Sequence, residues 1–279
     1  MNQLKLRRLI EGFLLEDIGN GDLTSEAIFH PNQIATGLFT AKESGIIAGL
    51  PIIKEAYTLL DPHMEVELLI SEGEEVASYE PLAQVRGPAV HLLSGERVIL
   101  NLIQRMSGIA TLTNLCVRTL NDPNIQLCDT RKTTPGLGML EKYAVRIGGG
   151  KNHRSGLYDG VLIKDNHISL CGSITDAVSS IRNQIGHTRK IEVEVETKEQ
   201  VLEAVSVGAD IIMLDNCEPN KVIEFMELIP QSIITEASGG ISLRNLHEYA
   251  NTGFDYISLG FLTHSVRSLD ISLTVQTIN

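Results

Sequence analysis

The chain has 279 residues, of which 43% are hydrophobic and 21% charged, a composition typical of a globular protein with one large or two medium domains. The net charge of −12, the aromatic content of 4% and the absence of tryptophan argue against nucleic-acid binding, which needs a basic stripe or stacking aromatics. The four cysteines form no CxxC pair and no apolar run is long enough to span a bilayer, so we expect a cytoplasmic protein with reduced thiols and no membrane partner.

The first part of the chain predicts an α+β domain. Residues 1–19 alternate apolar and charged side chains with the period of an amphipathic helix. Strand-like runs with glycine-rich turns follow at 35–49, 64–76 and 81–93, and these indicate a mostly antiparallel sheet. A helical stretch at 95–120 then leads into the second part of the chain.

Beyond residue 124, short apolar runs alternate with helical patterns. The runs are IQLC (125–128), VLIK (161–164), KIEVEVE (190–196), ADIIML (209–214), SIITEA (232–237) and DYISLG (255–260). One intervening helix has clear limits, with a capping box from Thr197 to Gln200 and a terminal Gly208. Such strand–helix units make a parallel sheet, either closed as a barrel or open and doubly wound. Because polar or glycine residues follow all six runs, we favour an α/β barrel, incomplete because only six strands are clear.

Cations are concentrated between Arg131 and Lys164, where seven Lys or Arg face two acids and the local net charge is +5. The cations are Arg131, Lys132, Lys142, Arg146, Lys151, Arg154 and Lys164. They alternate with Gly, Pro, Asn and His and do not follow helical spacing, which favours a focused anion site over a solvated basic face. His153, in a polar loop beside Arg154, is the histidine best suited to this site.

Carboxylates on one strand predict a cation site. Glu192, Glu194 and Glu196 alternate with valines, so they share one face and point into a barrel, unless this is an edge strand with a solvated acidic face. Buried carboxylates need cations or a metal nearby. Asp215 ends the next strand, so Glu194 and Asp215 form a pair suited to Mg²⁺, with waters and substrate oxygens completing the shell.

The turn at Ser238, Gly239 and Gly240 precedes a helix that we expect to begin near Ser242. Backbone N–H groups in such a turn bind phosphate, and Gly260 at the next strand end offers a second loop for the same group. Turn glycines without a ligand are the simpler alternative. No Walker A, GxGxxG or hydrolase motif is present, so the residues indicate transfer between a phosphorylated sugar and an acidic substrate, with electrostatic catalysis.

Together these segments closely resemble the quinolinate phosphoribosyltransferase family (nicotinate-nucleotide pyrophosphorylase, carboxylating). The segments are EDIGNGDLTS, SGERVILNLIQRMSGIAT, DTRKTTPG, KYAVRIGGGKNHR, LIKDNH, EVEVE, IIMLDN, EASGGI and SLGFLTHS, and they cover nearly the whole chain. The resemblance implies that quinolinate and phosphoribosyl pyrophosphate are converted to nicotinate mononucleotide, CO₂ and pyrophosphate in NAD biosynthesis. It implies an N-terminal α/β sandwich domain at 1–108, joined by 267–279, and an incomplete α/β barrel at 109–266.

The resemblance also implies residue roles. Quinolinate would be held by Arg97, Arg131, His153, Arg154 and Lys164. Phosphoribosyl pyrophosphate would be held by Thr130, Lys132, Glu194, Asp215, Ser238, Gly239, Gly240, Leu259, Gly260 and Phe261. Lys132, Glu194 and Asp215 would be catalytic, and the latter two would serve Mg²⁺. Arg97 would come from the neighbouring subunit, which makes a homodimer the minimal unit.

One position departs from the family pattern, since Gly138 stands where many relatives have arginine, which bears on substrate affinity or on a subunit contact. Two alternatives stay open. One is a related phosphoribosyltransferase for another pyridine or base, or a homologue associated with molybdenum transport, which the intact KDNH and NHR segments disfavour. The other is a non-catalytic metabolite-binding homologue, which would be expected to have lost several of these charged residues.

Overall fold

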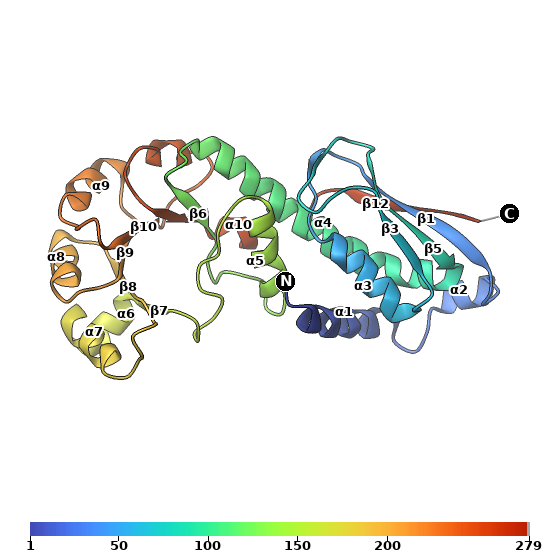
Figure 1. Cartoon of the computed structure of the whole chain (residues 1–279), viewed down its shortest axis with the longest axis horizontal. Helices are drawn as coiled ribbons and strands as arrows, with labels where there is room; N and C mark the ends of the chain where they lie inside the picture. Colours follow the sequence, from blue (N-terminus) through green and yellow to red (C-terminus); the bar gives the residue numbers. More distant parts are fainter. Residues whose placement is uncertain (278–279) are drawn as a thin grey trace. The chain divides into compact units, whose positions relative to one another are not determined.

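The computed structural model of the chain describes residues 1–277, so the last two residues of the predicted closing segment 267–279 lie outside the described part. The chain divides into two compact units (Figure 1). The first comprises 1–112, 139–148 and 266–279, and the second comprises 113–138 and 149–265. None of the helices in the described residues is long and apolar enough to cross a membrane.

The first unit is built on an antiparallel sheet with the order β12-β1-β5-β3, and the C-terminal strand β12 pairs with β1 along its length. Its elements are α1 (Gln3–Ile18), α2 (Leu23–Ile28), β1 (Ile34–Ala41), β2 (Gly45–Ile46), α3 (Leu50–Leu60), β3 (Glu65–Leu68), β4 (Glu75–Val76), β5 (Pro81–Pro88) and β12 (Ile271–Thr277). The predicted antiparallel α+β domain is therefore confirmed. A short pair, β2 with β4, forms a separate ladder.

Helix α4 (Ala89–Leu120) confirms the predicted long helix but begins six residues earlier than its pattern suggested, so the third strand-like run ends at Pro88 and not at Leu93. Its predicted apolar stripe is buried, from Val98 at 7% exposure to Ile109 at 0%. Helix α1 likewise buries its apolar face, and Asn2 caps its first turn by accepting the backbone N–H of Lys5.

The second unit contains all six predicted parallel strands. These are β6 (Gln126–Cys128), β7 (Val161–Ile163), β8 (Ile191–Val195), β9 (Ile211–Asp215), β10 (Ile234–Ser238) and β11 (Tyr256–Ser258). Its helices are α6 (Asp165–Cys171), α7 (Ile174–Arg182), α8 (Lys198–Ser206), α9 (Pro219–Met226), the 3₁₀ helix η1 (Leu246–Tyr249) and α10 (Phe261–His264). Helix α5 (Gly138–Ile147) follows β6 in sequence, but all of it except Gly138 belongs to the first unit. Helices α7, α8 and α9 lie outside the curved row of strands (Figure 1).

The strand order is β6-β11-β10-β9-β8-β7, so the first strand pairs with the last, as in a barrel. Neighbours in sequence are neighbours in the sheet from β7 to β11, but no pairing of described residues joins β6 to β7. A single bridge from Lys151 to Cys128 extends the sheet beyond β6 at this opening. The arrangement is therefore an incomplete α/β barrel, with the segment after Lys151 crossing its open side.

Local signals explain one helix and correct another. Thr197 and Gln200 form the predicted capping box of α8, and Gly208 follows the helix with a φ of +74°. The α-helix expected near Ser242 is replaced by the 3₁₀ helix η1, which begins four residues later. A helical turn does start at Ser242, because its carbonyl accepts the Leu246 N–H at 2.9 Å and the Asn245 side chain accepts its N–H at 2.7 Å.

Candidate active site

A cavity of about 540 Å³ lies at the carboxyl ends of the barrel strands. Its lining residues are Thr130, Arg131, Lys132, His153, Arg154, Leu162, Lys164, Glu194, Met213, Asp215, Asn216, Ser238, Gly239, Gly240 and Ser258. On β9, Met213 and Asp215 line the cavity and Leu214 between them does not, because strand side chains alternate between faces. The cavity therefore brings together most of the predicted cations, both predicted metal carboxylates and the glycine turn.

Three Lys or Arg residues predicted to bind quinolinate line this cavity: Arg131, Arg154 and Lys164. Arg154 donates from Nη1 to the Gly160 carbonyl at 2.9 Å, while its buried Nε has no hydrogen-bond partner in the described part of the chain. Burial, and then the charge of Arg131, lower the pKa of Arg154. Cations that destabilise one another in this way favour an anionic ligand, and a guanidinium binds a carboxylate through two parallel hydrogen bonds.

The predicted carboxylate pair also lines the cavity. Lys164 Nζ donates to Glu194 Oε2 at 2.8 Å, and Asp215 accepts from the side chain of Asn216 at 2.6 Å. Burial, followed by the charges of Glu194 and Glu196, raises the pKa of Asp215. Glu196 itself follows the end of β8 and is exposed, so of the three glutamates predicted to point inward, only Glu192 and Glu194 lie on the strand.

The turn after β10 has the backbone of an anion-binding loop. Gly239 and Gly240 have φ angles of +78° and +64°, a conformation that favours glycine. A Cβ on Gly239 would also clash with the Asn216 side chain and lie 2.7 Å from the Asn216 backbone nitrogen. The turn is fixed from the neighbouring strand end by the Asn216 N–H, which donates to the Ser238 carbonyl at 2.8 Å. The next helix in the described chain is the 3₁₀ helix η1, six residues after Gly240, so the loop itself presents the N–H groups.

The segment after β11, from Leu259 to Thr263, packs against Lys132. A Cβ on Gly260 would lie 3.0 Å from Lys132 Cδ, and Thr263 Oγ1 donates to the Lys132 carbonyl at 2.8 Å. Leu259 is buried at 1% exposure and its N–H donates to the Cys128 carbonyl. Gly260 thus contacts the Lys132 side chain, whereas Leu259, Gly260 and Phe261 do not themselves line the cavity.

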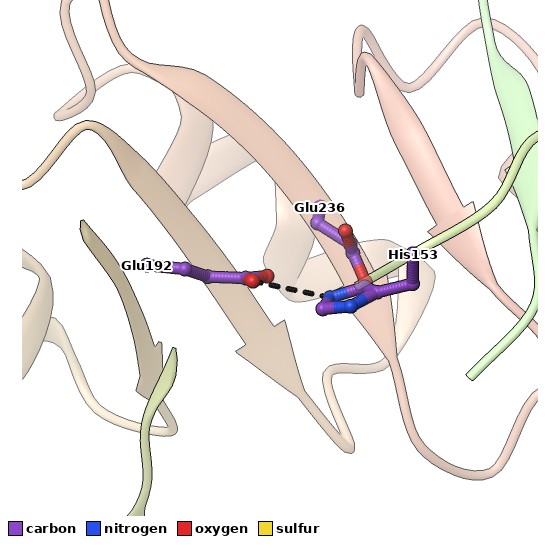
Figure 2. A group of neighbouring side chains, drawn as sticks. All are labelled: His153, Glu192 and Glu236. Carbon is purple, nitrogen blue, oxygen red and sulfur yellow. Dashed lines mark ion pairs between the residues drawn. The ribbon is translucent and has the colours of Figure 1, made fainter. Parts of the chain in front are cut away.

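His153 differs from the other predicted ligands because both of its ring nitrogens face protein groups. Nδ1 accepts the backbone N–H of Arg154 at 2.8 Å, and Nε2 lies 3.1 Å from Glu192 Oε2 and 3.6 Å from Glu236 Oε1 (Figure 2). Asp129 accepts the backbone N–H of His153 at 2.9 Å. His153 also lines a second cavity of about 730 Å³, which contains Glu192 and Glu236.

The remaining predicted residues lie elsewhere. Arg97 is exposed on the part of α4 that belongs to the first unit. Lys142 and Arg146, on α5, are also in the first unit, and Gly138 begins that helix. Sequence reasoning did not single out Asn216, Met213 or Leu162 as cavity residues. Strand alternation would have found the latter two, since they stand two residues before Asp215 and Lys164.

An incomplete α/β barrel whose strand ends carry cations, carboxylates and a glycine turn defines a class of enzyme that binds phosphorylated, anionic substrates. The sequence matches the family described as quinolinate phosphoribosyl transferase, C-terminal domain, over residues 109–274, and the N-terminal domain of the same family over residues 22–107. The chain belongs to the quinolinate phosphoribosyltransferase family.

Individual relatives are similar over almost their whole length. The chain is 57% identical to a probable nicotinate-nucleotide pyrophosphorylase [carboxylating] of Bacillus subtilis (strain 168), covering 100% of this chain and 96% of that protein. It is 40% identical to quinolinate phosphoribosyltransferase [decarboxylating] 2b, mitochondrial, of Nicotiana tabacum, covering 98% and 82%. Among solved structures, NadC of Streptococcus pyogenes has a TM-score of 0.96 at 36% identity, covering 100% of this chain and 99% of that one.

Proposed function

We propose that the protein transfers the phosphoribosyl group of phosphoribosyl pyrophosphate to quinolinate, with loss of CO₂, to give nicotinate mononucleotide and pyrophosphate in NAD biosynthesis. The observation that carries the proposal is the convergence in one cavity of Arg131, Arg154 and Lys164 with the Gly239–Gly240 turn and the Glu194/Asp215 pair. A dicarboxylate and a phosphorylated sugar need these groups together. The names of close relatives describe the same reaction.

In this proposal Arg131, Arg154 and Lys164 hold the two quinolinate carboxylates, and His153 orders the backbone beside them. The turn from Ser238 to Gly240 holds the 5′-phosphate. Thr130 and Lys132 bind the pyrophosphate, since the Thr130 hydroxyl accepts the Lys132 N–H at 3.0 Å and keeps the two residues in one turn. The corner at Leu259, Gly260 and Phe261 acts indirectly, because Gly260 contacts the Lys132 side chain.

The chemistry follows from charge. As the pyridine nitrogen attacks the anomeric carbon, negative charge grows on the departing pyrophosphate, where the ammonium of Lys132 stabilises it. Ribosylation makes the ring nitrogen cationic, so the electron pair left at the adjacent carbon when CO₂ departs is stabilised by that nitrogen. No covalent intermediate with the protein is needed.

Glu194 and Asp215 fit a magnesium ion. Both offer carboxylate oxygens, the donor type that Mg²⁺ prefers, and the raised pKa of Asp215 reflects a burial and a like-charge repulsion that a cation would relieve. A bound Mg²⁺ would neutralise charge on phosphate oxygens. We further propose a cytoplasmic homodimer in which Arg97 of one protomer completes the quinolinate pocket of its partner, because Arg97 is exposed on α4.

The direct test is to incubate the protein with quinolinate, phosphoribosyl pyrophosphate and Mg²⁺ and to follow nicotinate mononucleotide and CO₂. Nicotinate replaces quinolinate in a parallel reaction, since it lacks the carboxylate that is lost. We expect equal amounts of both products from quinolinate and a much slower reaction with nicotinate. Folded protein that forms neither product would contradict the proposal, and a preference for nicotinate would assign another pyridine.

A further inference from the structure

A buried acidic cluster lies inside the barrel, one layer below the substrate cavity. Glu192 and Glu236 are 4% and 5% exposed, and their side chains point toward His153 from strands β8 and β10 (Figure 2). Glu192 Oε1 and Glu236 Oε1 are buried and have no hydrogen-bond partner among residues 1–277 that the structure describes. Two buried carboxyl groups around one imidazole are costly unless protons or a cation neutralise them.

The hydrogen bonds of the ring favour protons over a metal. Nδ1 accepts the Arg154 N–H at 2.8 Å, so its lone pair is used and the proton of the neutral ring is on Nε2. That Nε2–H points at Glu192 Oε2, 3.1 Å away. A nitrogen that carries a proton has no lone pair for a metal ion, although the ligand atoms of His153, Glu192 and Glu236 all lie within 4.8 Å of one another.

Groups of both kinds face Glu236. Glu192 on β8 and Asp129 beyond β6 disfavour its charged form, whereas His153, on the segment that crosses the open side of the barrel, and the Ser258 hydroxyl on β11 favour it. Strand β9, between β8 and β10, contributes no charge at this level, because Met213 pairs in register with Glu236. Burial, and then the charge of Glu192, raise the pKa of Glu236. A neutral Glu236 beside Glu192 is the arrangement that these groups favour.

We propose that Glu192 and Glu236 are positioning residues of the transferase site: Glu192 accepts the Nε2–H of a neutral His153, Glu236 stands beside it as an uncharged acid, and the locked ring fixes Arg154 in the substrate cavity. The link to Arg154 is the hydrogen bond from its own N–H to Nδ1. The guanidinium of Arg154 then reaches the Gly160 carbonyl and leaves its buried Nε without a protein partner. The role of Arg154 in quinolinate binding rests on the proposed function.

The state of the ring is tested without any substrate. Nitrogen NMR of wild-type protein labelled with ¹⁵N-histidine distinguishes the Nε2–H form, the Nδ1–H form and the doubly protonated ring, and the signal missing from a His153→Gln sample assigns His153. We expect the neutral Nε2–H form at pH 7. Either of the other two forms would overturn the proposal, whatever reaction the protein catalyses.

The positioning role is tested by calorimetric titration with quinolinate. We expect Glu192→Leu, which removes the acceptor, to raise the Kd for quinolinate roughly tenfold, the effect of losing about one hydrogen bond, and Glu192→Gln to restore most of the affinity. Exposed Glu199→Gln is the control and should match wild type. Equal losses in the leucine and glutamine variants would overturn the proposal.

The neutral state of Glu236 is tested by the pH profile of the same Kd. In wild type, ionisation of Glu236 above neutral pH should weaken quinolinate binding by about tenfold, because a second negative charge then lies below the dianion. Glu236→Gln copies the neutral acid, so its Kd should equal that of wild type at pH 6 and stay flat to pH 8.5. If the Kd of the variant rose with pH as steeply as that of wild type, the proposal would be overturned. If the wild-type protein did not bind quinolinate at all, the proposed function would be contradicted instead.

Discussion

Lys164 and Glu194 form an ion pair inside the substrate cavity, with Lys164 Nζ 2.8 Å from Glu194 Oε2. The two side chains come from the ends of adjacent strands, β7 and β8. One is assigned to quinolinate and the other to the ribose and metal side, so this pair joins the two halves of the site. An ammonium that is already paired binds a substrate carboxylate less strongly than a free one, since the new contact competes with the old.

Glu194→Gln should therefore separate binding from turnover. We expect the Kd for quinolinate to stay equal or to fall, because Lys164 is released, while kcat drops by about a hundredfold or more because the carboxylate on the metal side is lost. Calorimetry gives the first quantity and product formation the second. Glu224→Gln is a matched control, since Glu224 pairs with Lys198 at 3.1 Å on the exposed surface. A large rise in Kd for the Glu194 variant would contradict the proposed competition.

Arg131 and Lys132 are adjacent in sequence but should have different roles. Arg131→Ala should chiefly weaken quinolinate binding, because a guanidinium that holds a carboxylate contributes to affinity. Lys132→Ala should lower turnover far more than it lowers quinolinate affinity, because charge develops on the pyrophosphate only as it leaves. Binding isotherms and steady-state rates of both variants check this. An unchanged isotherm for Arg131→Ala would remove it from the pocket, and a purely binding defect would contradict the role of Lys132.

Strand positions could be predicted from the sequence because alternation and strand ends are local properties. The inward direction of Glu194 followed from alternation in its strand and the place of Asp215 from the end of the next strand, and both line the cavity. The meeting of Glu192 with Glu236 was not predictable in this way. It depends on the strand order, in which β9 separates β8 from β10, and on His153 crossing the open side of the barrel.

The helix predicted near Ser242 is shorter than expected. Serine is typical of a helix start, and the Ser242 carbonyl does accept the Leu246 N–H at 2.9 Å, but the helix that follows is the four-residue 3₁₀ helix η1. Charge density also grouped cations that the fold separates. Lys142, for example, is 6% exposed on α5 in the first unit and does not line the cavity. The local excess of cations located the site in the sequence, and only the fold showed which of these cations line the cavity.

Gly239 should be irreplaceable for a steric reason beyond its backbone angle. Gly239→Ala places a Cβ against Asn216, so the turn must shift, and we expect the KM for phosphoribosyl pyrophosphate to rise about tenfold or more. Gly208→Ala is the matched control, because Gly208 has a similar φ of +74° and nothing within 4 Å of the added Cβ. Both variants carry a strain on the order of 1 kcal/mol, but only the first should affect KM. Equal KM values would show that the turn does not hold the phosphate.

Glu236 should make stability depend on pH. Burial and the charge of Glu192 raise its pKa to about 7 from an ordinary value of 4.5, so between these values the folded protein holds a proton that the unfolded chain releases. As far as this group is concerned, the free energy of unfolding should therefore be highest below pH 4.5, fall progressively up to about pH 7 by up to about 3 kcal/mol in all, and level off above that pH. Glu236→Gln carries no such proton, so denaturant unfolding at pH 6 and pH 8.5 should show a smaller loss of stability in the variant than in wild type. Glu199→Gln, on the exposed face of α8, should keep the wild-type difference. If Glu236→Gln lost as much stability as wild type over this range, Glu236 would be ionised throughout, and the charge of the cluster would have to be balanced by His153.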